Sequence, residues 1–320
     1  MSSYFTLLLV LLLGGIVSVI AAVVVMALSL LRPPRMTDVK ALWVLRRVSP
    51  LDVGLAYEEM DFAVRDEPSG GRLRIAGWWI PHPTAQGRCV VMLHGYADAK
   101  IGAMAWGPLW HRLGFNILAI DLRAHGYSGG TFSTAGCRER YDVSQVIDQL
   151  RTARPGDSRQ IALFGVSLGA AVAAATAALR DDVSIVVLDS PYARFESTAI
   201  AHMHRLGASG PLLGRAALCL AKKIADVDFS DVRLDPLLAS IAAPVAVIGA
   251  ADDELLSAAD RAEIAAAMDK RKSSGNQRDQ YWLADRADHL SVLYTNPQEY
   301  EQRLAAFIER ALAVPSKVES

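Results

Sequence analysis

The stretch Gly165-Val166-Ser167-Leu168-Gly169 fits the pattern Gly-x-Ser-x-Gly, in which a serine sits on a sharp turn between a strand and a helix. The flanking residues agree with this placement. Residues 161–164 form a short apolar run typical of a buried strand, and the alanine-rich residues 170–179 predict a helix. Such a turn strains the serine backbone, so side chains at Gly165 and Gly169 would collide with neighbouring backbone. The pattern predicts a nucleophilic serine that requires an acid and a histidine later in the chain, in that order.

Short apolar runs recur along the chain and alternate with helical segments. Strands are predicted at about 58–64, 73–80, 89–93, 115–120, 161–164, 183–188, 245–248 and 281–283. Helices are predicted at about 138–153, 168–180, 258–269 and 297–313. The turn-forming residues Pro68–Gly71 predict a hairpin between the first two strands. This alternation indicates an α/β fold with a mostly parallel, eight-stranded sheet and helices on both faces.

The carboxyl ends of parallel strands are where ligands bind in such sheets. Several polar residues lie at or just after predicted strand ends, namely His94, Asp121, Ser167, Asp189 and Asp252. Residues 191–240 interrupt the alternation with a helical stretch that we interpret as a short lid over these ends. The main domain is expected to span residues 56–314, and a polar tail follows at 315–320.

The N-terminal segment, residues 1–35, contains a long apolar run. Phe5 to Leu31 carries no charge and exceeds the roughly 20 residues needed to span a bilayer. A cleaved signal peptide, which would make the protein secreted or periplasmic, fits less well because no basic residue precedes the run. Basic residues cluster after it, at Arg32, Arg35, Lys40, Arg46 and Arg47. The sequence therefore predicts a single membrane-spanning helix with the rest of the chain in the cytoplasm, joined by a juxtamembrane connector at 36–55.

Composition narrows the classes of partner. The 320-residue chain has a net charge of −1, which gives no electrostatic basis for nucleic-acid binding. Its three cysteines have no framework spacing and suggest free thiols. No residues show metal-ligand spacing, and no Gly-x-Gly-x-x-Gly follows the first strands, so we expect neither a metal nor another cofactor. The oligomeric state stays open.

The serine needs a base within hydrogen-bond reach, and the base needs an orienting acid. Of seven histidines, only His289 lies after the last predicted strand, so chain order selects it. For the acid we select Asp252, the third residue after the glycine that ends the penultimate apolar strand. Asp253 is its nearest rival, and Asp189, after an earlier strand, is a weaker alternative.

An oxyanion formed during acyl transfer requires two hydrogen-bond donors. One is the backbone N–H of Leu168, directly after the serine. The other is expected from Tyr96, after the strand that ends in His94-Gly95. The Tyr96 ring could instead only line the pocket.

From about Leu73 onward, the chain resembles serine hydrolases of the α/β-hydrolase fold. The resemblance rests on Leu93–Tyr96, Asp121–Ser128, Gly165–Gly169, and on Gly249–Asp252 with His289. More narrowly, the chain is similar to the BEM46-like group and to serine aminopeptidase-type lipases. In the family the turn matching Asp121–Ser128 is structural, although this chain has Ala124 where glycine is usual.

The resemblance implies a membrane-tethered hydrolase that cleaves carboxylic esters, including lipid or acyl esters, through a covalent acyl-enzyme. A thioesterase or peptidase would use the same residues. A catalytically silent fold that serves as a membrane-bound binding protein is the alternative from another class.

Overall fold

Eight strands form one sheet within the residues that the computed structural model describes, which are 2–66, 70–205 and 210–313. The strands are β1 (Glu58–Arg65), β2 (Arg72–Ile80), β3 (Arg88–Leu93), β4 (Asn116–Ile120), β5 (Gln160–Val166), β6 (Val183–Asp189), β7 (Val245–Ala250) and β8 (Gln280–Ala284). Their order across the sheet is β1-β2-β4-β3-β5-β6-β7-β8. Only the β1–β2 and β2–β4 pairs are antiparallel. The predicted mostly parallel, eight-stranded sheet is thus confirmed.

The hairpin at the sheet edge pairs β1 with β2 in continuous register. Glu58 lies opposite Trp79 at one end, and Arg65 lies opposite Arg72 at the other. The turn predicted at 68–71 falls mostly on residues 67–69, which lie outside the described part of the chain.

Helices cover both faces of the sheet. They are α1 (Ser2–Leu31), α2 (Asp38–Leu45), α3 (Lys100–Ala103), α4 (Gly107–Arg112), α5 (Glu139–Ala153), α6 (Leu168–Ala177), α7 (Phe195–Arg205), α8 (Pro211–Ala225), α9 (Leu234–Ser240), α10 (Ala258–Ser273), α11 (Val292–Thr295) and α12 (Pro297–Leu312). Two short 3-10 helices, η1 (Pro50–Val53) and η2 (Phe229–Val232), complete the described elements. One face is covered by α5, α6, α9 and α10, and the other by α3, α4, α11 and α12.

Each central strand is buried on both sides, which explains its uninterrupted apolar sequence. In β3, Val91 and Leu93 pack into the core beneath α5 and α6. Val90 and Met92 point to the opposite face and join the core beneath α4 and α12. Successive side chains of a strand point to opposite faces, so a run without polar residues fills two cores at once.

The segment expected to be a juxtamembrane connector, residues 36–55, contains α2 and η1. Met36, Ala41 and Leu55 from this segment are buried and belong to the core on the α3 side of the sheet. The segment is therefore anchored to the body through these buried residues.

The region interpreted as a lid, residues 191–240, contains α7, α8, η2 and α9, while residues 206–209 lie outside the described part. α9 packs against α6 and α10 and so extends the helical layer on the sheet. α7 and α8 pack against each other, and α8 also contacts α1. These two helices form the part of the region that stands off the sheet.

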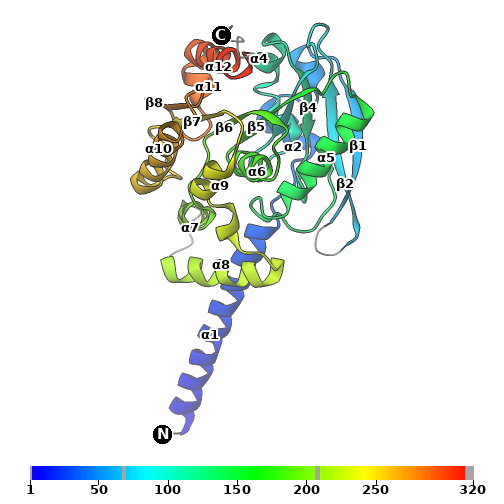
Figure 1. Cartoon of the computed structure of the whole chain (residues 1–320). Coiled ribbons are helices and arrows are strands. Elements are labelled where there is room, and N and C mark those ends of the chain that lie inside the picture. The colour runs from blue at the N-terminus through cyan, green and yellow to red at the C-terminus, as the bar shows by residue number, and fades with distance from the viewer. Residues whose placement is uncertain (1, 67–69, 206–209, 314–320) are drawn as a thin grey trace.

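The N-terminal helix projects from the body, and α8 lies across its base (Figure 1). Residues 3–22 of α1 are all exposed, whereas Ala27, Leu30 and Leu31 are buried in the core shared with α6. Within the described residues, Ser3–Leu31 is the one stretch long and apolar enough to cross a membrane. The helix thus has an unpacked N-terminal part and a C-terminal part built into the body.

Candidate active site

The turn between β5 and α6 holds Ser167 in a strained backbone conformation, with φ 52° and ψ −113°. Close packing leaves no room for side chains on either side of it. A Cβ on Gly165 would lie 2.0 Å from the carbonyl oxygen of Gly169. A Cβ on Gly169 would lie 2.1 Å from the carbonyl oxygen of Leu93. The two glycines therefore allow the turn to present the serine at the carboxyl end of β5, next to β3.

His289 lies between β8 and α11 and contacts the serine directly. Its Nε2 is 2.9 Å from Ser167 Oγ, and its Nδ1 is 2.6 Å from Asp253 Oδ2. An ionised carboxylate only accepts hydrogen bonds, so Nδ1 carries the proton that it donates to Asp253. Nε2 is then unprotonated and accepts from the serine hydroxyl, which is the arrangement a general base requires.

Asp253 replaces Asp252 as the acid beside the histidine, which corrects the choice made from sequence. The Asp253 side chain is fully buried, and its second oxygen accepts the backbone N–H of Leu255 at 2.8 Å. Asp252 is exposed, and its backbone N–H donates to the carbonyl oxygen of Ala287 at 3.0 Å. That bond fixes the turn after β7 so that Asp252 faces solvent and the next residue faces the histidine.

Asp189, the other carboxylate considered, is structural. It is buried at the end of β6 and accepts hydrogen bonds from Tyr300 Oη at 2.7 Å and from Ser190 Oγ at 2.9 Å. Burial raises the pKa of Asp189 above its ordinary value. This carboxylate therefore ties α12 to the strand end and is not the partner of Nδ1.

Ser190 is a supporting residue that sequence reasoning missed. Its Oγ accepts the backbone N–H of Leu290 at 3.3 Å, and Leu290 is the neighbour of His289. Ser190 has a positive φ of 50°, which a non-glycine residue adopts rarely. Both the positive φ and the contact with Leu290 arise only in the folded chain. The residue types of Leu188-Asp189-Ser190-Pro191 therefore gave no signal of them.

The two predicted oxyanion donors flank the serine. Leu168 is the first residue of α6, where a backbone N–H has no intrahelical acceptor. Tyr96 follows Gly95, and a Cβ built on Gly95 would lie 3.7 Å from the Cβ of Ser167, so this loop packs directly against the serine. Both backbone groups therefore border the space in front of the hydroxyl.

His94 fixes the loop that carries Tyr96. Its Nδ1 is 2.7 Å from the carbonyl oxygen of Gly95, and its Nε2 accepts the backbone N–H of Leu122 at 2.9 Å. Complete burial lowers the pKa of His94 to about 3, so the ring is neutral and Nδ1 is the donor. This histidine joins the ends of β3 and β4 and has no contact with the reacting serine.

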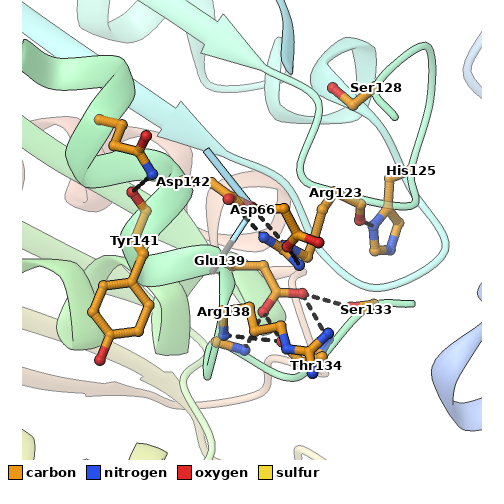
Figure 2. Close-up of polar contacts among 12 residues, drawn as sticks. Asp66, Arg123, His125, Ser128, Ser133, Thr134, Arg138, Glu139, Tyr141 and Asp142 are labelled. Atoms are coloured by element: carbon orange, nitrogen blue, oxygen red, sulfur yellow. Dashed lines mark hydrogen bonds and ion pairs between the residues drawn. The ribbon is translucent and has the colours of Figure 1, made fainter. Parts of the chain in front are cut away.

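The turn at Asp121–Ser128 is held by buried ion pairs. Asp121 accepts from Lys100 Nζ at 2.7 Å, and both side chains are buried. Arg123 donates to both oxygens of Asp142 at 2.6 and 2.7 Å and also pairs with Asp66, as Figure 2 shows. These partners engage the charged groups of the turn, in agreement with a structural role.

An apolar pocket of about 260 Å³ opens in front of Ser167. It is lined by Leu30, Gly95, Tyr96, Asp98, Ser167, Leu168, Tyr192, Phe195, Thr198, Ala199, His202, Leu255, His289 and Leu290. α7 therefore forms one wall, as expected of a lid. The two histidines of α7, which are separated by Met203, face differently: His202 lines the pocket, while His204 is exposed.

Among the described residues that line this pocket, Asp98 is the one carboxylate. Burial raises the pKa of Asp98 to about 6, and its Oδ1 has no hydrogen-bond partner within the described residues. A Cβ on Gly102 would lie 1.9 Å from Asp98 Oδ2, so glycine leaves room for this side chain. Sequence reasoning did not single out Asp98.

No group of three or more potential metal ligands occurs in the described residues.

Comparisons with known proteins agree with this architecture. Residues 84–224 match a family model described as serine aminopeptidase, S33. The chain is 30% identical over 202 residues to an uncharacterised protein of Mycobacterium tuberculosis, covering 62% of this chain and 65% of the relative. It is 29% identical over 148 residues to an uncharacterised protein of Bacillus subtilis, covering 45% and 48%. The matches thus span less than two thirds of either relative.

Among solved structures, an esterase of Pyrococcus furiosus superposes with a TM-score of 0.69 at 23% identity, covering 88% of this chain and all of that one. An acylaminoacyl peptidase of Pyrococcus horikoshii superposes with a TM-score of 0.58 at 15% identity, covering 83% and 44%. The chain has the α/β-hydrolase fold.

Proposed function

We propose that this chain of α/β-hydrolase fold is a serine hydrolase that cleaves carboxylic esters at Ser167. The observation that carries the proposal is the continuous hydrogen-bonded path from Ser167 Oγ through His289 to the buried Asp253, which opens on an apolar pocket. A hydroxyl becomes nucleophilic when a base accepts its proton and an acid orients that base.

The reaction follows from these contacts. Ser167 Oγ bonds to the ester carbonyl carbon while its proton moves to Nε2 of His289. Asp253 stabilises the resulting imidazolium, and the N–H groups of Leu168 and Tyr96 bind the oxyanion. The carbon–oxygen bond of the ester breaks, and the alcohol leaves with the proton from Nε2. Water then repeats the sequence on the acyl-enzyme and releases the carboxylic acid and the free serine.

The N-terminal helix is proposed to anchor the enzyme in a membrane. Its exposed residues 3–22 extend about 30 Å at 1.5 Å per residue, which is the thickness of a bilayer's hydrocarbon core. Leu30 and Leu31 are buried in the body, so cleavage near Arg32 would remove part of the core. This supports an uncleaved anchor with the basic residues that follow it on the cytoplasmic side. Recovery of the chain from alkali-washed membranes with its N-terminus intact is expected, and a mature chain that begins near Arg32 would overturn the anchor.

A peptidase is the second candidate. Asp98 offers a carboxylate in the pocket that could pair with the amino group of a peptide, and the matched family model is described as a serine aminopeptidase. Hydrolysis of aminoacyl p-nitroanilides compared with p-nitrophenyl esters separates the two activities. The thioester alternative and similarity to the BEM46-like group remain predictions from the resemblance. A silent binding protein is disfavoured by the hydrogen bonds of the Ser167–His289–Asp253 set.

The proposal is tested with a fluorophosphonate probe and p-nitrophenyl esters. Wild type should be labelled and should hydrolyse the esters, whereas Ser167→Ala should lose labelling and about 10⁶-fold in kcat. Ser273→Ala is the control, because Ser273 is an exposed residue of α10 and should behave as wild type. Labelling that survives in Ser167→Ala would disprove the assignment of the nucleophile.

A further inference from the structure

The last turns of α1 form part of the catalytic pocket. Leu30 lines this pocket together with Tyr96 and Ser167, and only 8% of its surface is exposed. The hydroxyl of Tyr96 donates to the backbone carbonyl of Ser29. The side chain of Tyr96, which follows Gly95, is thereby joined to the N-terminal helix.

The end of α1 is fixed to the body. The backbone N–H of Ser133 donates to the carbonyl oxygen of Leu31 at 2.8 Å. The loop that provides this N–H is itself held by the buried Glu139, which accepts from Thr134 Oγ1 at 2.6 Å (Figure 2). Glu139 also accepts the backbone N–H of Gly136 at 2.9 Å. The wall that Leu30 provides is therefore a fixed surface.

A second set of hydrogen bonds, which we call the Arg35 clamp, fixes the chain just beyond the helix. Arg35 donates to the carbonyl oxygens of His125, Gly126, Ser128 and Gly130. Four acceptors on one guanidinium leave it little freedom, so the chain leaving α1 is held against the turn that follows β4.

The pocket is also close to the exposed part of the helix. Leu30 follows residue 22, the last of the continuous exposed run, by eight residues, which is about 12 Å along a helix. α8 packs across α1 at its base (Figure 1). A bilayer that encloses the exposed run would therefore end about 12 Å, measured along the helix, from Leu30 in the pocket wall.

We propose that α1 is a component of the active site and that Leu30 is a specificity-determining residue, which limits the length of the acyl chain bound next to Ser167. The inference rests on the proposed ester hydrolysis and adds that the substrate is an acyl ester taken from the membrane surface. The pocket of about 260 Å³ lies just below the roughly 300–1,000 Å³ typical of sites for drug-sized ligands. It is therefore suited to an acyl chain of limited length, and removing wall atoms at Leu30 should admit a longer one.

The test compares variants of Leu30 in the full-length protein. Leu30→Ala and the milder Leu30→Val should shift the ratio of kcat/KM for long to short p-nitrophenyl esters upward, by about tenfold or more for alanine, since one methylene in an apolar pocket changes selectivity by roughly 10–200-fold. Leu30→Phe should shift the ratio downward. Opposite shifts cannot arise from a general loss of folding.

The matched controls are Leu12→Ala and Leu12→Phe, because Leu12 lies in the exposed part of the same helix and should leave the ratio unchanged. Fluorophosphonate labelling of Ser167 is measured in every variant. Labelled Leu30 variants with the wild-type ratio would overturn the role of α1, whereas absence of labelling in wild type would overturn the proposed function itself.

Discussion

Replacing Asp253 by asparagine should remove almost all catalytic activity while leaving the site folded. In the native site, Asp253 Oδ1 accepts the N–H of Leu255 at 2.8 Å and Oδ2 lies 2.6 Å from Nδ1 of His289. In Asp253→Asn the amide oxygen keeps the bond to Leu255, which turns the NH₂ group toward the histidine. Nδ1 must then accept, so the proton moves to Nε2, and His289 can no longer accept the proton of Ser167. We expect a loss of about 10⁴ in kcat, equivalent to about 5 kcal/mol of transition-state stabilisation.

The matched variant is Asp252→Asn, which changes the same group one residue away. Asp252 is exposed and should retain activity within about threefold of wild type. Both variants are assayed with a p-nitrophenyl ester, and thermal unfolding verifies that each is folded. The proposed role of Asp253 is refuted if Asp253→Asn is folded and keeps more than a tenth of the wild-type kcat, or if Asp252→Asn loses activity to the same extent.

Three further predictions concern stability and local geometry. Gly165→Ala should abolish fluorophosphonate labelling, because its Cβ would lie 2.0 Å from a backbone oxygen across the turn, while Gly156→Ala, in open space, should label normally. Lys100→Met should lower the free energy of unfolding by about 3–5 kcal/mol, since it leaves Asp121 buried without its cation; adding Asp121→Asn should recover part of the loss in denaturant titrations. The pKa of Asp98, raised by burial from 3.8 to about 6, means that the folded state binds more protons than the unfolded chain between these values. Asp98 should therefore contribute a fall in stability of up to about 3 kcal/mol as the pH rises through that window. The loss of stability between pH 4 and pH 7 should be smaller in Asp98→Asn than in wild type by that amount, in unfolding measured across this range.

The sheet and the serine turn could be predicted because each leaves a continuous residue pattern in the sequence. Uninterrupted apolar runs specify strands buried on both faces, and the requirement for Gly165 and Gly169 arises from backbone within the turn and from the adjacent strand β3. His289 was found by chain order, which reflects the fixed topology of the sheet.

The choice between Asp252 and Asp253 could not be made from sequence. It depends on a backbone bond from Asp252 to Ala287, which lies 35 positions later in the chain and turns one side chain outward and the next inward. Residue types alone carry no information about that rotation.

The contribution of Leu30 to the pocket was equally hidden. Residues 19–28, which precede it, are all apolar, so periodicity does not reveal where burial in protein begins. In the structure the boundary lies near residue 22, where continuous exposure of the helix ends.

The clamp formed by Arg35 has a mechanical consequence. An enzyme on a slack tether can swing and meet substrates over a wide arc above the surface. Here Arg35 binds four carbonyl groups within a few residues of the helix end, so no free length remains between the helix and the body. With α1 in a bilayer, Ser167 would be held at a fixed distance from the membrane surface and in a fixed orientation to it. Its encounters would then follow lateral diffusion in the plane, and turnover would scale with the surface density of the substrate more than with its bulk concentration.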